Sequence, residues 1–85
     1  MKIVADNKIP YINGVLEPFA EVVYLPGRSI TAENVKDADA LLVRTRTRCD
    51  ETLLAGSRVR MVATATIGMD HIDSEWCRDA GVAVV

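Results

Sequence analysis

An unusual run of arginines and threonines follows one hydrophobic stretch of the sequence. Residues 44–48 read Arg-Thr-Arg-Thr-Arg and come directly after the apolar stretch 38–43. Guanidinium groups bind carboxylates and phosphates through paired hydrogen bonds, and threonine hydroxyls can donate to an oxyanion as well. The run is therefore typical of a site for a small anion, with Thr45 as the main candidate and Arg44 and Arg46 as secondary candidates.

A second segment with hydroxyl-bearing side chains follows the next hydrophobic stretch. Residues 64–71 read Thr-Ala-Thr-Ile-Gly-Met-Asp-His. Thr66 supplies another hydroxyl, and Gly68 lets the backbone approach a ligand closely because it has no Cβ. Thr66 is therefore a further candidate, and the two segments together predict a small, anionic, hydroxylated ligand.

Each candidate also has a purely structural interpretation. A charged loop after a strand is usually a solvated surface, and for Arg46 and Arg48 we give this interpretation more weight. Threonines often cap local turns, so for Thr45 and Thr66 we weight capping and ligand contact equally. His71 precedes a predicted helix and is the only histidine in the chain, so we interpret it as structural.

The sequence contains no recognisable nucleotide, metal or triad motif. The five glycines stand at positions 14, 27, 56, 68 and 81, and they do not form a G-x-G-x-x-G or a P-loop. Two distant cysteines and one histidine do not form a zinc pattern. A receiver domain would need an acidic residue at the end of the third strand, where Val43 and Arg44 stand instead. We therefore expect no catalytic, cofactor-binding or metal-binding residue in this chain.

The elements that position these segments are predicted from hydrophobic patterning. Five apolar stretches, short and bounded by polar residues or by turn dipeptides such as Pro26-Gly27, predict strands. These stretches are residues 2–5, 21–25, 38–43, 60–64 and 82–85.

Helices are predicted between the strands. Pro10 suits the first turn of one helix, which Pro18 should end near residue 17. The apolar residues at helical spacing in this helix are Tyr11, Ile12, Val15, Leu16 and Phe19.

Three further short helices are predicted from their first residues. Thr31 can cap a helix that runs to about residue 36, and Asp50 can cap a helix that carries two leucines before Gly56. The last helix runs from about Asp73 to residue 80, and Gly81 stands just past its end.

The alternation of strands and helices predicts an α/β fold with a parallel sheet covered on both faces. Because crossovers are right-handed, few topologies remain, and we expect a flavodoxin-like, three-layer open sheet of five strands in the order 2-1-3-4-5. Ligands of such sheets bind beyond the carboxyl ends of the strands, where the strand order reverses. Residues 6–8, 44–48 and 64–71 are expected to converge there.

The composition is that of one small domain. The chain has 85 residues and a formal net charge of −2, which gives no basic face for nucleic acid. The sequence has no secretory signal, and no stretch approaches the ~20 apolar residues of a membrane span. Cys49 and Cys77 are interpreted as reduced, inert thiols, so we expect a cytoplasmic protein with neither nucleic-acid nor membrane partners.

The two candidate segments resemble a known family. Residues 43–47, followed by Glu-Thr-Leu-Leu-Ala-Gly at 51–56, are similar to the Arg-Ser/Thr-x-Thr loop and leucine-bearing helix of the D-2-hydroxyacid dehydrogenases. Residues 64–73 resemble the family's loop ending in Gly-x-Asp-x-Ile-Asp, with His71 where many relatives have asparagine. The Thr-Ala-Thr start and the Asp-His pair are most similar to the erythronate-4-phosphate dehydrogenase branch.

The resemblance implies an activity and a site. The activity is the NAD-dependent oxidation of 4-phospho-D-erythronate at its 2-hydroxyl, in pyridoxal 5′-phosphate biosynthesis, by a two-domain homodimer. The resemblance also implies that Thr45 and Thr66 contact substrate, with Thr45 where some relatives have serine. The family's catalytic arginine, glutamate and histidine and its NAD loop lie in a later domain, so His71 is not the catalytic histidine.

We therefore interpret residues 1–85 as a truncated substrate-binding domain, without the NAD-binding domain and inactive alone. The resemblance implies that a returning segment would cover one face of this domain, so we expect an exposed apolar patch and self-association. Two alternatives stay open. One is another D-2-hydroxyacid dehydrogenase, because the Arg/Thr loop suits any small carboxylate, and the other is an excised or engineered flavodoxin-like module without a ligand.

Overall fold

The described residues form five strands, three α-helices and one 3-10 turn. The structure is a computed structural model that describes residues 1–10, 12–66 and 68–85. Tyr11 of the predicted first helix and Ile67 of the segment 64–71 lie outside the described residues. The elements are β1 (Lys2–Asp6), β2 (Glu21–Leu25), η1 (Gly27–Ser29), α1 (Ala32–Val35), β3 (Ala40–Val43), α2 (Glu51–Leu54), β4 (Met61–Thr64), α3 (Ser74–Asp79) and β5 (Ala83–Val84). None of the helices in this described part is long and apolar enough to cross a membrane.

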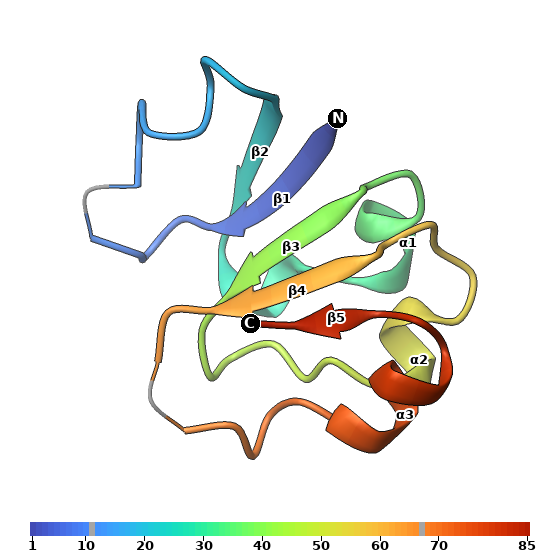
Figure 1. Cartoon of the computed structure of the whole chain (residues 1–85). Coiled ribbons are helices and arrows are strands. Elements are labelled where there is room, and N and C mark those ends of the chain that lie inside the picture. Colours follow the sequence, from blue (N-terminus) through green and yellow to red (C-terminus); the bar gives the residue numbers. More distant parts are fainter. Residues whose placement is uncertain (11, 67) are drawn as a thin grey trace.

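The five strands form one parallel sheet in the order β2-β1-β3-β4-β5 (Figure 1). β1 pairs with β2 from Lys2 opposite Glu21 to Asp6 opposite Leu25, and it pairs with β3 on its other side. The predicted α/β fold class and strand order are confirmed. The point where the strand order reverses lies between β1 and β3, so their carboxyl ends mark the expected position of a ligand.

A single hydrophobic core joins the sheet to the three α-helices. Side chains alternate between the two faces of a strand, and Val4, Leu41 and Val62 point to the face where the helices pack, where they are almost completely buried. The helices contribute to the same core Val35 from α1, Leu53 and Leu54 from α2, and Cys77 from α3. The three helices therefore cover one face of the sheet (Figure 1).

The helix predicted after Pro10 does not form. Residues 12–20 make a series of turns instead. Gly14 has a φ of +88°, a left-handed conformation that interrupts a helix. The Tyr24 hydroxyl donates to Glu17 Oε2 at 2.7 Å, which ties this segment to β2. The predicted helix layer on the second face of the sheet is therefore missing from the described residues.

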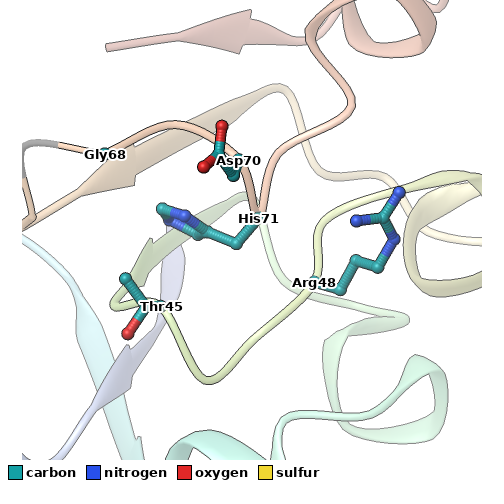
Figure 2. Close-up of a pocket in the computed structure, with 5 residues that line it drawn as sticks. All are labelled: Thr45, Arg48, Gly68, Asp70 and His71. Carbon is teal, nitrogen blue, oxygen red and sulfur yellow. The ribbon is translucent and has the colours of Figure 1, made fainter.

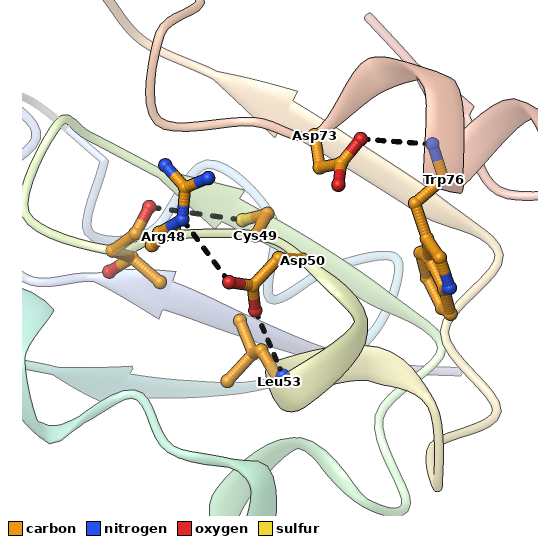
Figure 3. A network of polar contacts seen from close by, with 7 residues as sticks. Arg48, Cys49, Asp50, Leu53, Asp73 and Trp76 are labelled. Atoms are coloured by element: carbon orange, nitrogen blue, oxygen red, sulfur yellow. Dashed lines mark hydrogen bonds and ion pairs between the residues drawn. The ribbon is translucent and has the colours of Figure 1, made fainter.

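Two of the predicted helix caps are confirmed. The side chain of Asp50 accepts a hydrogen bond from Leu53 N at 3.2 Å, and that of Asp73 accepts one from Trp76 N at 3.0 Å (Figure 3). Thr31 stands at the N-cap of α1, but its side chain makes no cap hydrogen bond. The confirmed caps fix the starts of α2 and α3, which follow the two loops described next.

Candidate functional site

Two loops at the carboxyl ends of β3 and β4 are held side by side. The arginine loop (residues 44–48) follows β3, and the histidine loop (residues 65–71) follows β4. An isolated parallel bridge joins Cys49 to Ile72, with the Cys49 N–H donating to the carbonyl of His71 at 2.8 Å. Backbone pairing of this kind fixes the spacing of the two loops without using their side chains.

The two loops enclose a pocket of about 470 Å³, which we call the histidine pocket. It is lined by Thr45, Arg48, Gly68, Asp70 and His71 (Figure 2). Thr45 and Arg48 come from the arginine loop and the other three from the histidine loop. Figure 2 shows the imidazole of His71 close to Thr45, whereas the guanidinium of Arg48 extends away from it.

His71 lies at one end of a short chain of polar groups. Its ring is buried, and its Nε2 lies 3.0 Å from Thr64 Oγ1. Thr64 Oγ1 in turn lies 2.9 Å from Thr66 Oγ1 and accepts a hydrogen bond from Thr66 N at 3.3 Å. This series of polar contacts links the histidine pocket to the half-buried hydroxyl of Thr66.

A second, strongly cationic pocket of about 550 Å³ opens where β1, β2 and β3 end. We call it the arginine pocket, and it is lined by Asp6, Asn7, Lys8, Pro26, Gly27, Arg28, Arg44 and Arg46. Four of these side chains carry a positive charge at neutral pH. Within the described residues none of the four forms an ion pair, so they remain available to an anion.

Close packing shapes the floor of the arginine pocket. Asp6 is almost completely buried, and its Oδ1 accepts a hydrogen bond from Lys8 N at 2.8 Å. A Cβ at Gly27 would lie 2.7 Å from Arg46 Cβ and 2.8 Å from Asp6 Oδ2. The Thr47 hydroxyl donates to the Gly27 carbonyl at 3.0 Å. Thr47 is therefore a structural residue that holds the arginine loop against the start of η1.

Successive residues of the arginine loop serve the two pockets. Arg44 and Arg46 line the arginine pocket, whereas Thr45, which stands between them, lines the histidine pocket. Because consecutive Cα atoms are ~3.8 Å apart, the two pockets lie next to one another.

The structure separates the residues that the sequence grouped into one site. Thr45 lines one pocket, and Arg44 and Arg46 line the other. Thr66 lines neither pocket and is connected to the histidine pocket only through Thr64 and His71. The roles of these residues in ligand binding stay predictions.

Sequence reasoning missed several residues that line the two pockets. Lys8 lies two residues after β1, in the segment 6–8 that was expected at this edge, and Arg28 lies three residues after β2. Neither was named as a site candidate, although a position after a strand end is the same signal that pointed to Arg44. His71 was interpreted as structural, yet it lines a pocket. No local pattern predicts the contact of His71 with Thr64, because it depends on how the histidine loop folds back.

Arg48 is tied to the start of α2. Its Nε donates to Asp50 Oδ2 at 3.2 Å, and its side chain is 66% exposed (Figure 3). Asp50 also caps α2, so its carboxylate accepts from two donors. Arg48 therefore contributes less uncompensated charge to the histidine pocket than the four cations contribute to the arginine pocket.

The two cysteines are buried in the core and carry no chemistry at the site. Burial raises the pKa of the Cys49 thiol to about 12 and raises the pKa of the Cys77 thiol as well. A thiol with a raised pKa is neutral and unreactive at physiological pH. The described residues also contain no group of histidine, cysteine and carboxylate side chains that could hold a metal ion.

Comparison with known proteins gives a family. Residues 3–85 match the family model described as D-isomer specific 2-hydroxyacid dehydrogenase, catalytic domain. An erythronate-4-phosphate dehydrogenase of Bacteroides fragilis is 61% identical over 83 residues, which is 96% of this chain and 24% of that protein. One of Cellvibrio japonicus is 52% identical over 83 residues, covering 98% of this chain and 22% of that protein. The chain thus spans about a quarter of the length of these curated relatives.

Solved structures agree with the family. An NAD⁺-bound 3-phosphoglycerate dehydrogenase of Entamoeba histolytica superimposes with a TM-score of 0.78 at 29% identity, over 99% of this chain and 32% of the other. The family model covers all but the first two residues. The chain therefore belongs to the D-isomer specific 2-hydroxyacid dehydrogenase family.

Proposed function

We propose that this chain forms the substrate-binding side of an NAD-dependent dehydrogenase that oxidises the 2-hydroxyl of 4-phospho-D-erythronate, a step of pyridoxal 5′-phosphate biosynthesis. In this proposal residues 1–85 are a substrate-binding domain. The catalytic groups and the cofactor site belong to other parts of the protein, so the 85-residue chain does not turn over substrate.

The main support for the proposal is that successive residues of the arginine loop line two different pockets. The arginine pocket presents Arg44 and Arg46 with Lys8 and Arg28, a set suited to a phosphate. In this proposal the histidine pocket, which Thr45 lines, takes the carboxylate and 2-hydroxyl at the other end of the ligand. A four-carbon acid with a terminal phosphate has one anionic group for each pocket.

The names of the relatives support a phosphorylated substrate. The proteins of Bacteroides fragilis and Cellvibrio japonicus are erythronate-4-phosphate dehydrogenases, and the Entamoeba histolytica enzyme is a 3-phosphoglycerate dehydrogenase. Both names denote acids that carry a phosphate. An unphosphorylated 2-hydroxy acid would leave the arginine pocket without an anion.

The residues of this chain do not fit NAD themselves. The turn after β1 is Asp6-Asn7-Lys8 and has no glycine at which a pyrophosphate could approach the backbone. Gly27, which lines the same pocket, is already crowded by Asp6 and Arg46. We therefore assign no step of hydride transfer to this chain, and its part in the reaction is to hold and orient the substrate.

A calorimetric titration of the 85-residue chain tests the proposal. We expect 4-phospho-D-erythronate to bind at least about tenfold more tightly than D-erythronate, because hydrogen bonds between charged partners contribute about 1.5–3 kcal/mol each. The double substitution Arg44→Gln/Arg46→Gln should remove most of this difference. Thr45→Val should weaken both ligands about equally.

The matched control removes the same charge elsewhere. Arg60→Gln/Arg78→Gln changes two exposed arginines that line neither of the two pockets, so it should leave both affinities within about twofold, the scale of ordinary surface substitutions. Equal affinities for the two acids, or an equal loss in the control, would contradict the proposal.

A further inference from the structure

The hydroxyl of Thr64 has three polar neighbours and can form three hydrogen bonds. Thr66 N donates to it at 3.3 Å, Thr66 Oγ1 lies 2.9 Å away, and His71 Nε2 lies 3.0 Å away. A hydroxyl has one proton to donate and two lone pairs to accept with. The Thr66 N–H occupies one lone pair, so one proton and one lone pair remain for the other two contacts.

Only two arrangements satisfy both remaining contacts. In the first, His71 Nε2 carries a proton and donates it to Thr64, and the Thr64 hydroxyl donates to Thr66 Oγ1. The hydroxyl proton of Thr66 is then free to donate elsewhere. In the second, Nε2 is unprotonated and accepts from Thr64, and the Thr66 hydroxyl donates back to Thr64. Thr66 then presents only lone pairs.

The first arrangement suits a ligand that accepts a hydrogen bond from Thr66, and the second suits a ligand that donates one to it. Carboxylate and phosphate oxygens only accept hydrogen bonds, so an anion at Thr66 requires the first arrangement. Lone pairs directed at an anionic oxygen would repel it. The position of one proton on a buried imidazole therefore decides whether Thr66 attracts or repels the anion.

We propose that His71 is a positioning residue, whose Nε2 proton directs this chain of hydroxyls so that Thr66 donates to an anionic oxygen of the ligand. The part of the proposal that concerns a ligand rests on the proposed function and on the prediction that Thr66, which lines neither pocket, contacts the ligand. His71 acts through Thr64 and does not have to touch the ligand itself.

The exposure of Thr66 is compatible with the first arrangement. The Thr66 side chain is only half-buried, so in the first arrangement its free proton can donate to solvent until a ligand replaces the water. With an anion at Thr66, only the first arrangement satisfies every contact.

The nitrogen chemical shifts of the His71 imidazole show in which direction the hydrogen bonds among His71, Thr64 and Thr66 run. His71 is the only histidine, so a ¹⁵N-labelled sample gives one pair of ring resonances without assignment by mutation. At alkaline pH, where imidazoles are neutral, we expect the Nε2 resonance in the range of a protonated nitrogen and Nδ1 in that of an unprotonated one. The reverse pattern would overturn the proposal.

Binding of 4-phospho-D-erythronate to Thr64 variants tests the consequence. Thr64→Val keeps the shape of the side chain and cuts the link between His71 and Thr66, so we expect an affinity loss of up to about tenfold, similar to that of Thr66→Val. Thr64→Ser keeps the hydroxyl and should restore binding to within about twofold of the unaltered chain. A Thr64→Val variant that binds as tightly as the unaltered chain, with the same ring shifts, would contradict the proposal.

The two measurements distinguish this proposal from the proposed function. A chain that binds no phosphoerythronate contradicts the function, while the ring shifts still decide the direction of the hydroxyl chain. A chain that binds the ligand with Nδ1 protonated supports the function and overturns the role of His71.

Discussion

Gly27 lies where the segments that follow three strands meet. A Cβ at this position would lie 2.7 Å from Arg46 Cβ and 2.8 Å from Asp6 Oδ2, closer than real Cβ contacts. We predict that Gly27→Ala lowers the free energy of unfolding by about 1–3 kcal/mol, the usual effect of overpacking. Urea denaturation measures the change.

Gly56 provides the matched control for this prediction. It has no neighbour within 4 Å of an added Cβ, and its φ is not in the left-handed region. Gly56→Ala should therefore be neutral or stabilise by up to about 1 kcal/mol through the unfolded state. Similar losses in both variants would show that Gly27 is not specially crowded.

The Cys49 thiol gives a prediction about pH. Burial raises its pKa from 9.0 to about 12 in the folded chain. Because the folded-state pKa is the higher one, the stability that the neutral thiol contributes is complete below 9.0 and is lost as the pH rises toward 12. We expect the free energy of unfolding to fall from about pH 9 toward about pH 12, by up to roughly 1.4 kcal/mol per pH unit.

A cysteine variant separates this effect from other titrations. Cys49→Ala leaves the lysines and tyrosines unchanged, so its stability should fall less steeply over the same interval than that of the unaltered chain. Parallel curves for the two proteins would mean that Cys49 is not responsible.

The sequence was a better guide to which residues lie at the candidate site than to which of them lie together or contact one another. The Arg-Thr alternation predicted an anion-binding edge, and both Arg44 and Arg46 line a cationic pocket. It did not predict that Thr45 and the arginines line different pockets, because a loop has no fixed period from which to assign sides. The contact of His71 with Thr64 was likewise not predictable, since it depends on tertiary folding.

At the scale of elements, the N-caps give a matched pair of predictions. Asp73 accepts from Trp76 N at 3.0 Å, whereas Thr31 makes no side-chain cap hydrogen bond. We expect Asp73→Ala to lower the free energy of unfolding by about 1 kcal/mol and Thr31→Ala to change it by less than about 0.5 kcal/mol. Chemical denaturation of the two variants in parallel measures both, and an equal effect would contradict the cap assignment.

Strands were more predictable than helices in this chain. The parallel strands are short apolar runs ended by turn residues, and all five appeared at their expected positions within two residues. The helix expected after Pro10 failed because the apolar spacing of residues 12–19 competes with Gly14 and Pro18, which disrupt a helix. Phe19, one of the apolar residues at helical spacing in that predicted helix, is 82% exposed.

At the scale of the whole molecule, the sheet has one covered and one open face. Along β4, Val62 points to the helices and is completely buried, while Met61 on the opposite face is 39% exposed. By the alternation of side chains along their strands, Leu42 and Ala63 share that opposite face and are partly exposed, whereas Ile3 on the same face is buried. Exposed apolar surface favours association, so we predict that the isolated chain self-associates with rising concentration.

Light scattering over a wide range of concentrations tests this prediction. Met61→Glu places a charge on the open face and should reduce association. Met69→Glu changes a residue of nearly equal exposure (40%) in the histidine loop and should leave association unchanged. A chain that stays monomeric throughout, or an equal effect of both substitutions, would argue against the open face as the contact surface.

We propose that the carboxyl edge of the sheet binds a small phosphorylated 2-hydroxy acid through two adjacent pockets. Titration of the ¹⁵N-labelled chain with 4-phospho-D-erythronate, followed by backbone amide shifts, tests this binding most directly. We expect progressive, saturable shifts at Arg44, Thr45 and Arg46 and at Thr66 and His71, with the amides at the amino ends of the strands unchanged. No shifts, or shifts confined to residues remote from both loops, would contradict it.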